Sequence, residues 1–346
     1  MILQIFNKIS GHYEIIESII NKYFVIIGTK NITKIYLKVH EWDKSFKQYI
    51  LKKYPEIEFK LSKNFDFQIN CSIYPKHYDM ISKLDNKKFF FIAHDIENKL
   101  KVMENIFYLT PLAKRFLYAD IMPHMTKKEL NTNIPIYVIQ GHFGGKHTRR
   151  RNLNLLLNIF KHNYEKKFKI KFIGTGEIPE EFKPHLDKIE FVQNLNFVDY
   201  HKEFLDCYAM FTLTLKSTNK QYYKTKLTSS INYIRGYKLK AIIDQDLQDI
   251  YNLKDVETYT TEENVVDAFK RSLNDFYAKY IQGKKKNPEI KNDNSKNIND
   301  NKNNTKNEIN ITNEINTKNE NNSNNEINTK NDIKKINIKI TNNESK

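Results

Sequence analysis

The stretch "IPIYVIQGHFGGKHTRRRNLNLLLNIF" covers residues 134–160 and joins an apolar run, a glycine-containing loop and a second apolar run. The whole chain has nine glycines and six arginines, yet three of each lie between Gly141 and Arg151. The surrounding composition is rich in Lys, Asn, Ile, Tyr and Phe, so this concentration is local. The pattern predicts a strand, a tight loop and the start of a helix.

The second apolar run has helical spacing. Leu153, Leu156, Leu157 and Phe160 follow one another at i, i+3, i+4 and i+7. This spacing predicts a helix that turns one apolar face toward a sheet.

Similar apolar runs, separated by amphipathic stretches, recur on both sides of this segment. They span residues 2–6, 23–28, 34–39, 66–74, 87–94 and 105–110 before it, and 136–141, 169–174, 189–193, 209–215 and 239–244 from it onward. Continuous apolar runs that alternate with helices are typical of strands in a parallel sheet covered on both faces. The sequence therefore predicts an α/β fold with two Rossmann-like, doubly wound parallel sheets that face a cleft.

The domain boundaries follow from breaks in this rhythm. The proline-containing polar stretch "DIMPHMTKKELNTNIP" (120–135) predicts a linker. We expect an N-terminal domain at 1–119, a linker at 120–133 and a C-terminal domain at 134–283. Residues 284–346 contain no aromatic residue and repeat "NEINTKN", so they predict a disordered Asn/Lys-rich tail.

Charge and cysteine content narrow the function classes. The formal charge is +16, but it is spread along the chain and no nucleic-acid module accompanies it, which argues against a nucleic-acid partner. Cys71 and Cys207 are too few and too far apart for a disulfide framework or a zinc site. The chain lacks a signal-peptide pattern and an apolar run of about 18 residues. We expect a cytoplasmic protein without a transmembrane segment.

The glycine and arginine cluster predicts an anion site. Backbone N–H groups at the start of a helix bind phosphate, and a nearby cation completes such a site. The stretch "FIGTGEI" (172–178) predicts a second, G-x-G-like turn. The residues that we expect at the anion are Gly141, Gly144, Gly145, Lys146, Arg149, Arg150, Gly174 and Gly176. The alternative is that the glycines only form tight turns and the arginines are a solvated helix start.

The order of these features resembles the GT-B glycosyltransferases, in particular their retaining group of family 4. The resemblance is clearest over 134–252 and fainter over 1–110. A third motif, "YYKTKLTSSINYIRGYKLKAIID" (222–244), is similar to the helix-strand unit that meets the donor in that family. The resemblance implies that this unit contributes Tyr223, Lys226, Thr228, Ser229 and Ser230 to the donor site. Ordinary helix capping by Thr228 or Ser229 is the alternative.

The family implies a function for the two domains. The C-terminal domain would hold a nucleotide-diphosphate sugar, and the N-terminal domain an acceptor, which is a glycan, a protein or a small molecule. Transfer of the sugar would need no cofactor or metal, because lysines and arginines would stabilise the diphosphate.

One departure from the family leaves alternatives open. Many retaining members carry two glutamates, seven residues apart, in the third motif, whereas residues 207–243 contain no acidic residue. The alternatives are a catalytically inactive GT-B-like binding or structural protein, and a sugar-nucleotide epimerase of the same fold. The donor, the acceptor and the stereochemical outcome stay undetermined.

Two loops of the N-terminal half carry candidate acceptor-side residues. His94 and Asp95 follow the very apolar run 89–93, and a histidine oriented by a carboxylate is suited to act as a general base. The alternative for His94 is an ordinary hydrogen-bonding role in the loop. Gly11 and His12 follow the first apolar run and would face acceptor or diphosphate, unless they form a plain strand-helix turn.

Overall fold

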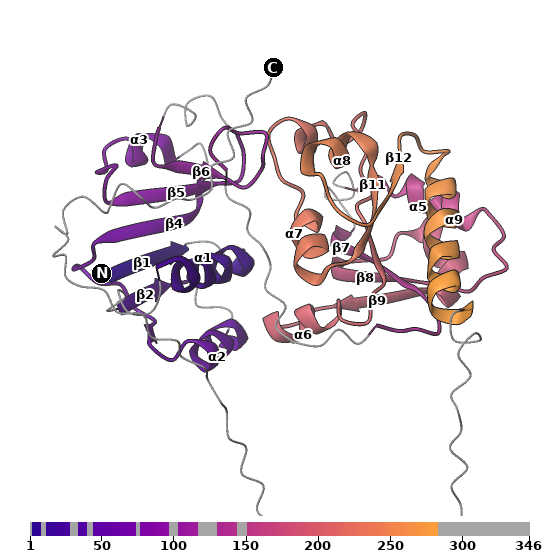
Figure 1. The fold of residues 1–346 in the computed structure, drawn as a ribbon, viewed down its shortest axis with the longest axis horizontal. Helices are drawn as coiled ribbons and strands as arrows, with labels where there is room; N and C mark the ends of the chain where they lie inside the picture. Colours follow the sequence, from indigo (N-terminus) through magenta and orange to yellow (C-terminus); the bar gives the residue numbers. More distant parts are fainter. Residues whose placement is uncertain are drawn as a thin grey trace, which may run out of the picture. The chain divides into compact units, whose positions relative to one another are not determined.

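The structure is a computed structural model that describes residues 2–7, 12–27, 34–39, 44–73, 77–96, 103–116, 130–143 and 151–282. Its strands form two six-stranded sheets (Figure 1). All strand pairs within both sheets are parallel. The α/β class and the two doubly wound sheets predicted from the sequence are confirmed.

The first sheet has the strand order β3-β2-β1-β4-β5-β6. Its elements are β1 (Ile2–Asn7), α1 (Tyr13–Ile27), β2 (Lys34–Lys38), α2 (Lys44–Lys53), β3 (Ile57–Glu58), β4 (Phe67–Ile73), α3 (Tyr78–Ile81), β5 (Phe89–Ala93) and β6 (Ile106–Tyr108). The chain changes direction across the sheet between β1 and β4. In an open α/β sheet, ligands bind at the carboxyl ends of the strands beside such a switch point.

The second sheet repeats this topology with the order β12-β11-β10-β7-β8-β9, and its switch point lies between β7 and β10. Its strands are β7 (Ile136–Phe143), β8 (Lys169–Gly176), β9 (Ile189–Gln193), β10 (Ala209–Phe211), β11 (Lys240–Asp244) and β12 (Val256–Tyr259). Its helices are α5 (Asn154–Phe160), α6 (Phe197–Lys202), α7 (Ser230–Tyr237), α8 (Gln245–Tyr251) and α9 (Val265–Phe276), with 3-10 turns at Glu180–Lys188 and Lys220–Tyr223 and a π-helical end at Tyr277–Gln282.

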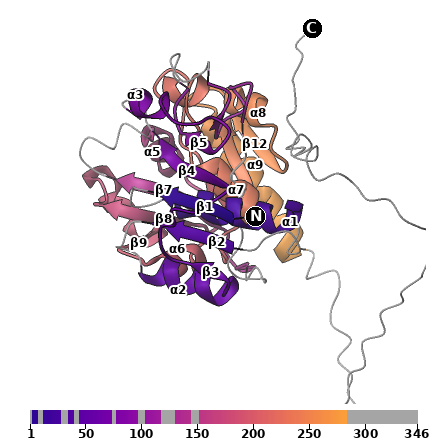
Figure 2. The same cartoon turned by 90° about the vertical axis from the view of Figure 1, so that its left-hand side faces the viewer.

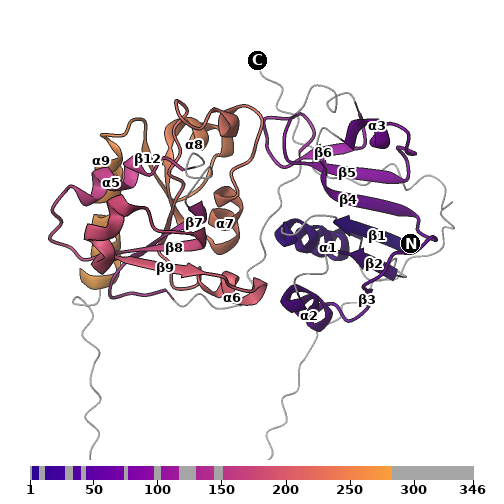
Figure 3. The same cartoon turned by 180° about the vertical axis from the view of Figure 1, so that it is seen from behind.

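The central strands of the second sheet are buried on both faces. Tyr137 and Ile139 of β7 belong to the cluster that contains α5 and α9, whereas Ile136 and Val138 belong to the cluster that contains α6, α7 and α8. Figure 3 shows α5 and α9 together on one side of this sheet and α7 on the other. This alternation explains why the strands are continuous apolar runs in the sequence.

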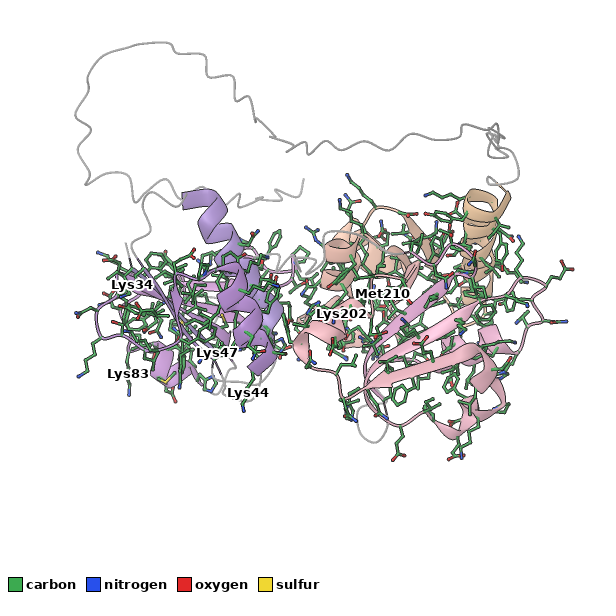
Figure 4. All side chains as sticks on the ribbon, turned by 90° about the horizontal axis from the view of Figure 1, so that it is seen from below. Lys34, Lys44, Lys47, Lys83, Lys202 and Met210 are labelled. Atoms are coloured by element: carbon green, nitrogen blue, oxygen red, sulfur yellow. The ribbon has the colours of Figure 1, made fainter. Side chains whose placement is uncertain are left out.

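The first sheet is covered in the same way. Its β1 and β2 side chains pack with α1 and α2, and Phe91 of β5 packs with Ile81 of α3 in a separate cluster. Figure 2 shows α3 near one edge of the first sheet and α2 near the opposite edge, beside β3. Charged residues lie outside these clusters, and Lys44 and Lys47 of α2 are exposed (Figure 4). In the second sheet, by contrast, the apolar Met210 of β10 is fully buried.

Three details of the predicted elements are wrong. Residues 23–27, expected in a strand, continue α1, because no helix breaker separates them from the amphipathic run before them. The buried face of α5 consists of Leu155, Leu156, Ile159 and Phe160, so the predicted apolar face was rotated by about a quarter of a turn. The short strands β3 and β12 were not predicted.

Among the described helices, none combines the length and the apolar character that crossing a bilayer requires. The predicted tail at 284–346 lies outside the described residues.

Candidate functional site

The carboxyl ends of β1, β4 and β5 bring His12, Ser72 and His94 together. These three strands are neighbours in the first sheet, and His94 directly follows β5, as predicted. The Nε2 atom of His94 lies 3.0 Å from Ser72 Oγ. The rings of His94 and His12 are 4.1 Å apart between centroids. The site on the first sheet is thus a cluster of a hydroxyl and two imidazoles.

The surroundings of His94 keep its ring neutral. The side chain is buried, with 8% of its surface exposed. Burial, followed by the nearby His12 and Lys226, holds the pKa of His94 well below its usual value. A neutral imidazole has a lone pair that can accept a proton.

Asp95 has a different partner from the one expected. Its carboxylate forms an ion pair with Lys226 Nζ at 3.2 Å. The two residues also form an antiparallel β-bridge, and Ile96 N donates to Thr225 O at 2.8 Å. The His94 ring is hydrogen-bonded to Ser72, and our expectation that Asp95 orients this ring stays a prediction.

A second cluster lies at the switch point of the second sheet, around Gln140 of β7. Its amide Nε2 donates to Ser229 Oγ at 2.6 Å, and its Oε1 accepts from Tyr200 OH at 3.2 Å. Its main-chain oxygen accepts from the Arg151 guanidinium at 3.2 Å. Arg151 also donates to Ser230 Oγ at 3.2 Å. The guanidinium is buried, with Arg151 8% exposed, beside the N-terminal end of α7.

The segment before α7 does not cap the helix with a side chain. Ser229 stands at the N-cap without a side-chain cap hydrogen bond, so the helix-capping alternative fails for this residue. Thr228 is 1% exposed, and its Oγ1 has no hydrogen-bond partner among the residues that the structure describes. A buried hydroxyl without a partner is costly unless a ligand binds it. Tyr223 is buried nearby in sequence, and burial raises its pKa.

Segment 225–230 contributes to both clusters. Thr225 and Lys226 contact the residues after β5, whereas Ser229 and Ser230 bind Gln140 and Arg151. Four residues span at most about 14 Å. The segment therefore brings residues of the two clusters close enough together for one small ligand to reach both.

The glycines that we expected in turns lie in strands. Gly141 lies within β7 and Gly174 and Gly176 lie within β8, so the expected G-x-G-like turn is a strand end. A Cβ atom on Gly174 would lie 1.7 Å from the carbonyl oxygen of Gly141, and one on Gly176 would lie 1.5 Å from that of Phe143. Both glycines are needed where the two strands approach closely.

Several predicted site residues lie outside the described residues: Gly11, Gly144, Gly145, Lys146, Arg149 and Arg150. Within the described ranges, no group of three or more His, Cys, Asp or Glu side chains is placed to hold a metal ion. The metal-free scheme stays a prediction.

Sequence reasoning missed Arg151, Gln140 and Ser72. Arg151 is the last arginine before the apolar helix face, and Gln140 and Ser72 are polar residues inside apolar runs. A polar residue in a strand that is buried on both faces is the signal that points to these positions.

Comparison with known proteins supports the fold. No family model matches the chain, and no curated protein sequence matches it. The solved structure of AviGT4, a glycosyltransferase involved in avilamycin A biosynthesis, is similar with a TM-score of 0.53 at 8% identity, over 79% of this chain and 88% of that one.

Two further solved structures have lower scores. The lipopolysaccharide outer core galactosyltransferase WaaB has a TM-score of 0.48 at 11% identity, over 80% of this chain and 91% of its own. A putative UDP-N-acetylglucosamine 2-epimerase from Listeria monocytogenes has a TM-score of 0.47 at 10% identity, over 81% and 90%. The likeness to AviGT4 establishes the fold, and this chain has a divergent GT-B-like fold of two Rossmann-like sheets.

Proposed function

We propose that this chain binds a nucleotide-diphosphate sugar at the second sheet and transfers the sugar to an acceptor held by the first. The observation that carries the proposal is the buried Arg151 guanidinium beside Ser230 at the start of α7. An anion at this point would meet the cation, the helix N-terminus and the hydroxyl of Thr228. A diphosphate has the charge and the acceptor oxygens for all three.

Lys226 is the second cation of this proposal. In the described contacts it pairs with Asp95, and its side chain is 39% exposed. A diphosphate would compete with Asp95 for this ammonium group. Charge develops on the diphosphate as the sugar leaves, so Arg151 and Lys226 would stabilise the transition state without a metal ion.

His94 is the proposed general base. Its neutral ring lies at the carboxyl end of β5, and segment 225–230 links this position to Arg151. The base would take the proton from an acceptor hydroxyl as that oxygen attacks the anomeric carbon of the sugar. Asp95 would then control Lys226 and not His94.

A second candidate is a catalytically inactive GT-B-like binding protein. It is favoured by one observation, the absence of any carboxylate in residues 207–243, where glutamates hold the donor in many retaining enzymes. An epimerase of the same fold remains a third candidate, which would convert a nucleotide sugar without an acceptor.

The test is calorimetric titration of UDP-, GDP-, ADP- and dTDP-sugars into the wild type and into Arg151→Met. One of these donors should bind the wild type, and the variant should bind it at least about tenfold more weakly, because a charge-assisted hydrogen bond contributes about 1.5–3 kcal/mol. Arg271→Met is the matched control, since Arg271 pairs with Glu257 on the exposed surface. Product analysis with and without acceptors then separates transferase, epimerase and inactive protein.

Two outcomes decide against the proposal. Equal affinity of the wild type and Arg151→Met would remove the guanidinium from the donor site. Binding without turnover by the wild type, with every donor and acceptor class, would favour the inactive binding protein.

A further inference from the structure

The backbone of β4 is irregular at Ser72. Its φ of +64° lies in the left-handed region, and the pairing of β4 with β5 shifts register between Asn70 and Ile73. Bulges of this kind re-aim side chains and are frequent next to active sites. Ser72 is 4% exposed, so the irregularity directs a polar side chain into the protein.

The strained backbone alone does not explain why residue 72 is a serine. Glycine adopts a positive φ without steric cost, whereas serine does not. Other non-glycine residues of the described part share this conformation, among them Lys238 and Asn252 at the ends of α7 and α8. What distinguishes Ser72 is the contact of its side chain, since the Oγ atom lies 3.0 Å from His94 Nε2.

The His94 ring is held from two sides. Ser72 bonds its Nε2 atom, and the His12 ring packs against it with an interplanar angle of 48°. The charged groups around the pair are Glu14, 3.5 Å from His12 Nδ1, and Lys226, which pairs with Asp95. A neutral imidazole has two tautomers, and a hydroxyl can bond either of them, by accepting from Nε2–H or by donating to a bare Nε2. Only the first arrangement leaves a lone pair on Nδ1 that can accept a proton.

We propose that Ser72 is a positioning residue for His94, and that the bulge in β4 holds the Ser72 hydroxyl where it accepts from Nε2–H, so that the ring keeps one orientation and keeps its lone pair on Nδ1. The structural part of this inference stands on geometry alone. Its consequence for catalysis rests on the proposed function, in which His94 is the base.

The first test uses the full chain without any donor. Ring-nitrogen NMR at neutral pH is recorded for the wild type, Ser72→Gly and Ser72→Ala, with His94→Gln to assign the signal among the ten histidines. Both variants lose the hydroxyl, but glycine relieves the backbone strain and alanine keeps it. We expect both to change the tautomer ratio of His94 by about two- to tenfold, which is the range that one hydrogen bond supplies.

Lys238→Gly is the control, because it places glycine at another left-handed position and should leave the His94 signal unchanged. An unchanged tautomer ratio in both Ser72 variants would overturn the inference. A change in Ser72→Gly but not in Ser72→Ala would assign the effect to the backbone and overturn it as well.

The second test is single-turnover transfer. Both Ser72 variants should lose at least about tenfold in turnover, less than the about 10²–10⁴-fold that loss of a general base costs in His94→Ala. Their donor affinity should stay the same. A failure of the proposed function shows itself as no transfer by the wild type, whereas failure of the positioning role shows itself as normal turnover in both variants or as an unchanged NMR signal.

Discussion

Gly141 and Gly174 lie opposite each other in the paired strands β7 and β8, but only one position has room for a side chain. A Cβ on Gly174 would overlap the backbone of Gly141 at 1.7 Å, and backbone cannot rotate away. Among the described residues, a Cβ on Gly141 would meet only Arg151 Nη2, at 4.0 Å. The sequence motif therefore contains one glycine with a packing role and one that borders the candidate donor site.

We expect Gly174→Ala to destabilise the protein by more than about 4 kcal/mol, because a backbone clash adds to a strained φ of +156°. Gly141→Ala should cost only about 1–3 kcal/mol, from its φ of +149° alone. Urea denaturation followed by circular dichroism measures both. Similar losses for the two variants would show that the strands can separate at Gly174.

The run Arg149 to Arg151 predicted an anion site, which stays a prediction. A run of identical residues does not by itself indicate that Arg151 is buried against the sheet. The position of Arg151 depends on Gln140 and Ser230, which are far away in the chain. Ser72 could not be predicted either, since a bulge depends on the register with β5.

At the scale of single elements, α8 begins at a buried carboxylate. Asp244 is the N-cap, 3% exposed, and accepts from Asp246 N at 3.0 Å. Burial, the largest cause, raises the pKa of Asp244 to about 6 from 3.8, with the Asp246 charge adding to it. At Asp244 the folded protein therefore binds more protons than the unfolded chain between these pH values, so the contribution of this group to stability falls as the pH rises from 3.8 to 6.

Asp244→Asn should remove this loss of stability. Asparagine caps a helix as well as aspartate does, and it carries no charge. We expect the variant to be more stable than the wild type by about 1–2 kcal/mol at pH 7.5 and to show no gain below pH 4. Thermal melts from pH 3 to 8 give the comparison, and Asp244→Ala, which loses the cap, serves as control. A difference in stability between Asp244→Asn and the wild type that does not grow between pH 4 and 6 would contradict the assignment.

The predicted elements show where sequence patterns suffice. Strands buried on both faces, such as β7 and β11, are uninterrupted apolar runs bounded by polar residues and were predicted. The end of α1 was mistaken for a strand because its residues are apolar and β-branched, and a run of six has no clear period. The strand β3 has two residues, too short to leave a pattern.

At the scale of the whole molecule, one aromatic residue links the helices of the two sheets. Phe197 begins α6, and its backbone N–H donates to Ser45 Oγ of α2 at 3.0 Å. Its ring packs on Phe46 at 4.9 Å and on Tyr13 at 5.8 Å between centroids. It is 6% exposed and belongs to a cluster that includes α1, α2 and α7. Alternation of strands and helices predicted the two sheets, but not this contact, because nothing local in the sequence specifies a partner 150 residues away.

We expect Phe197→Ala to uncouple the unfolding of the two sheets. Removing a buried phenylalanine costs about 3–5 kcal/mol, and two further contacts between the halves, Asp95 with Lys226 and Thr110 with Tyr251, are polar. Each sheet keeps its own apolar core, so the single calorimetric transition expected of the wild type should become two in the variant.

Phe172→Ala is the matched control. Phe172 is as deeply buried but packs only within the cluster of α5 and α9, so its loss should lower one common transition without splitting it. If Phe197→Ala unfolds in one transition, as Phe172→Ala does, then the polar contacts suffice to couple the sheets and Phe197 is not the link.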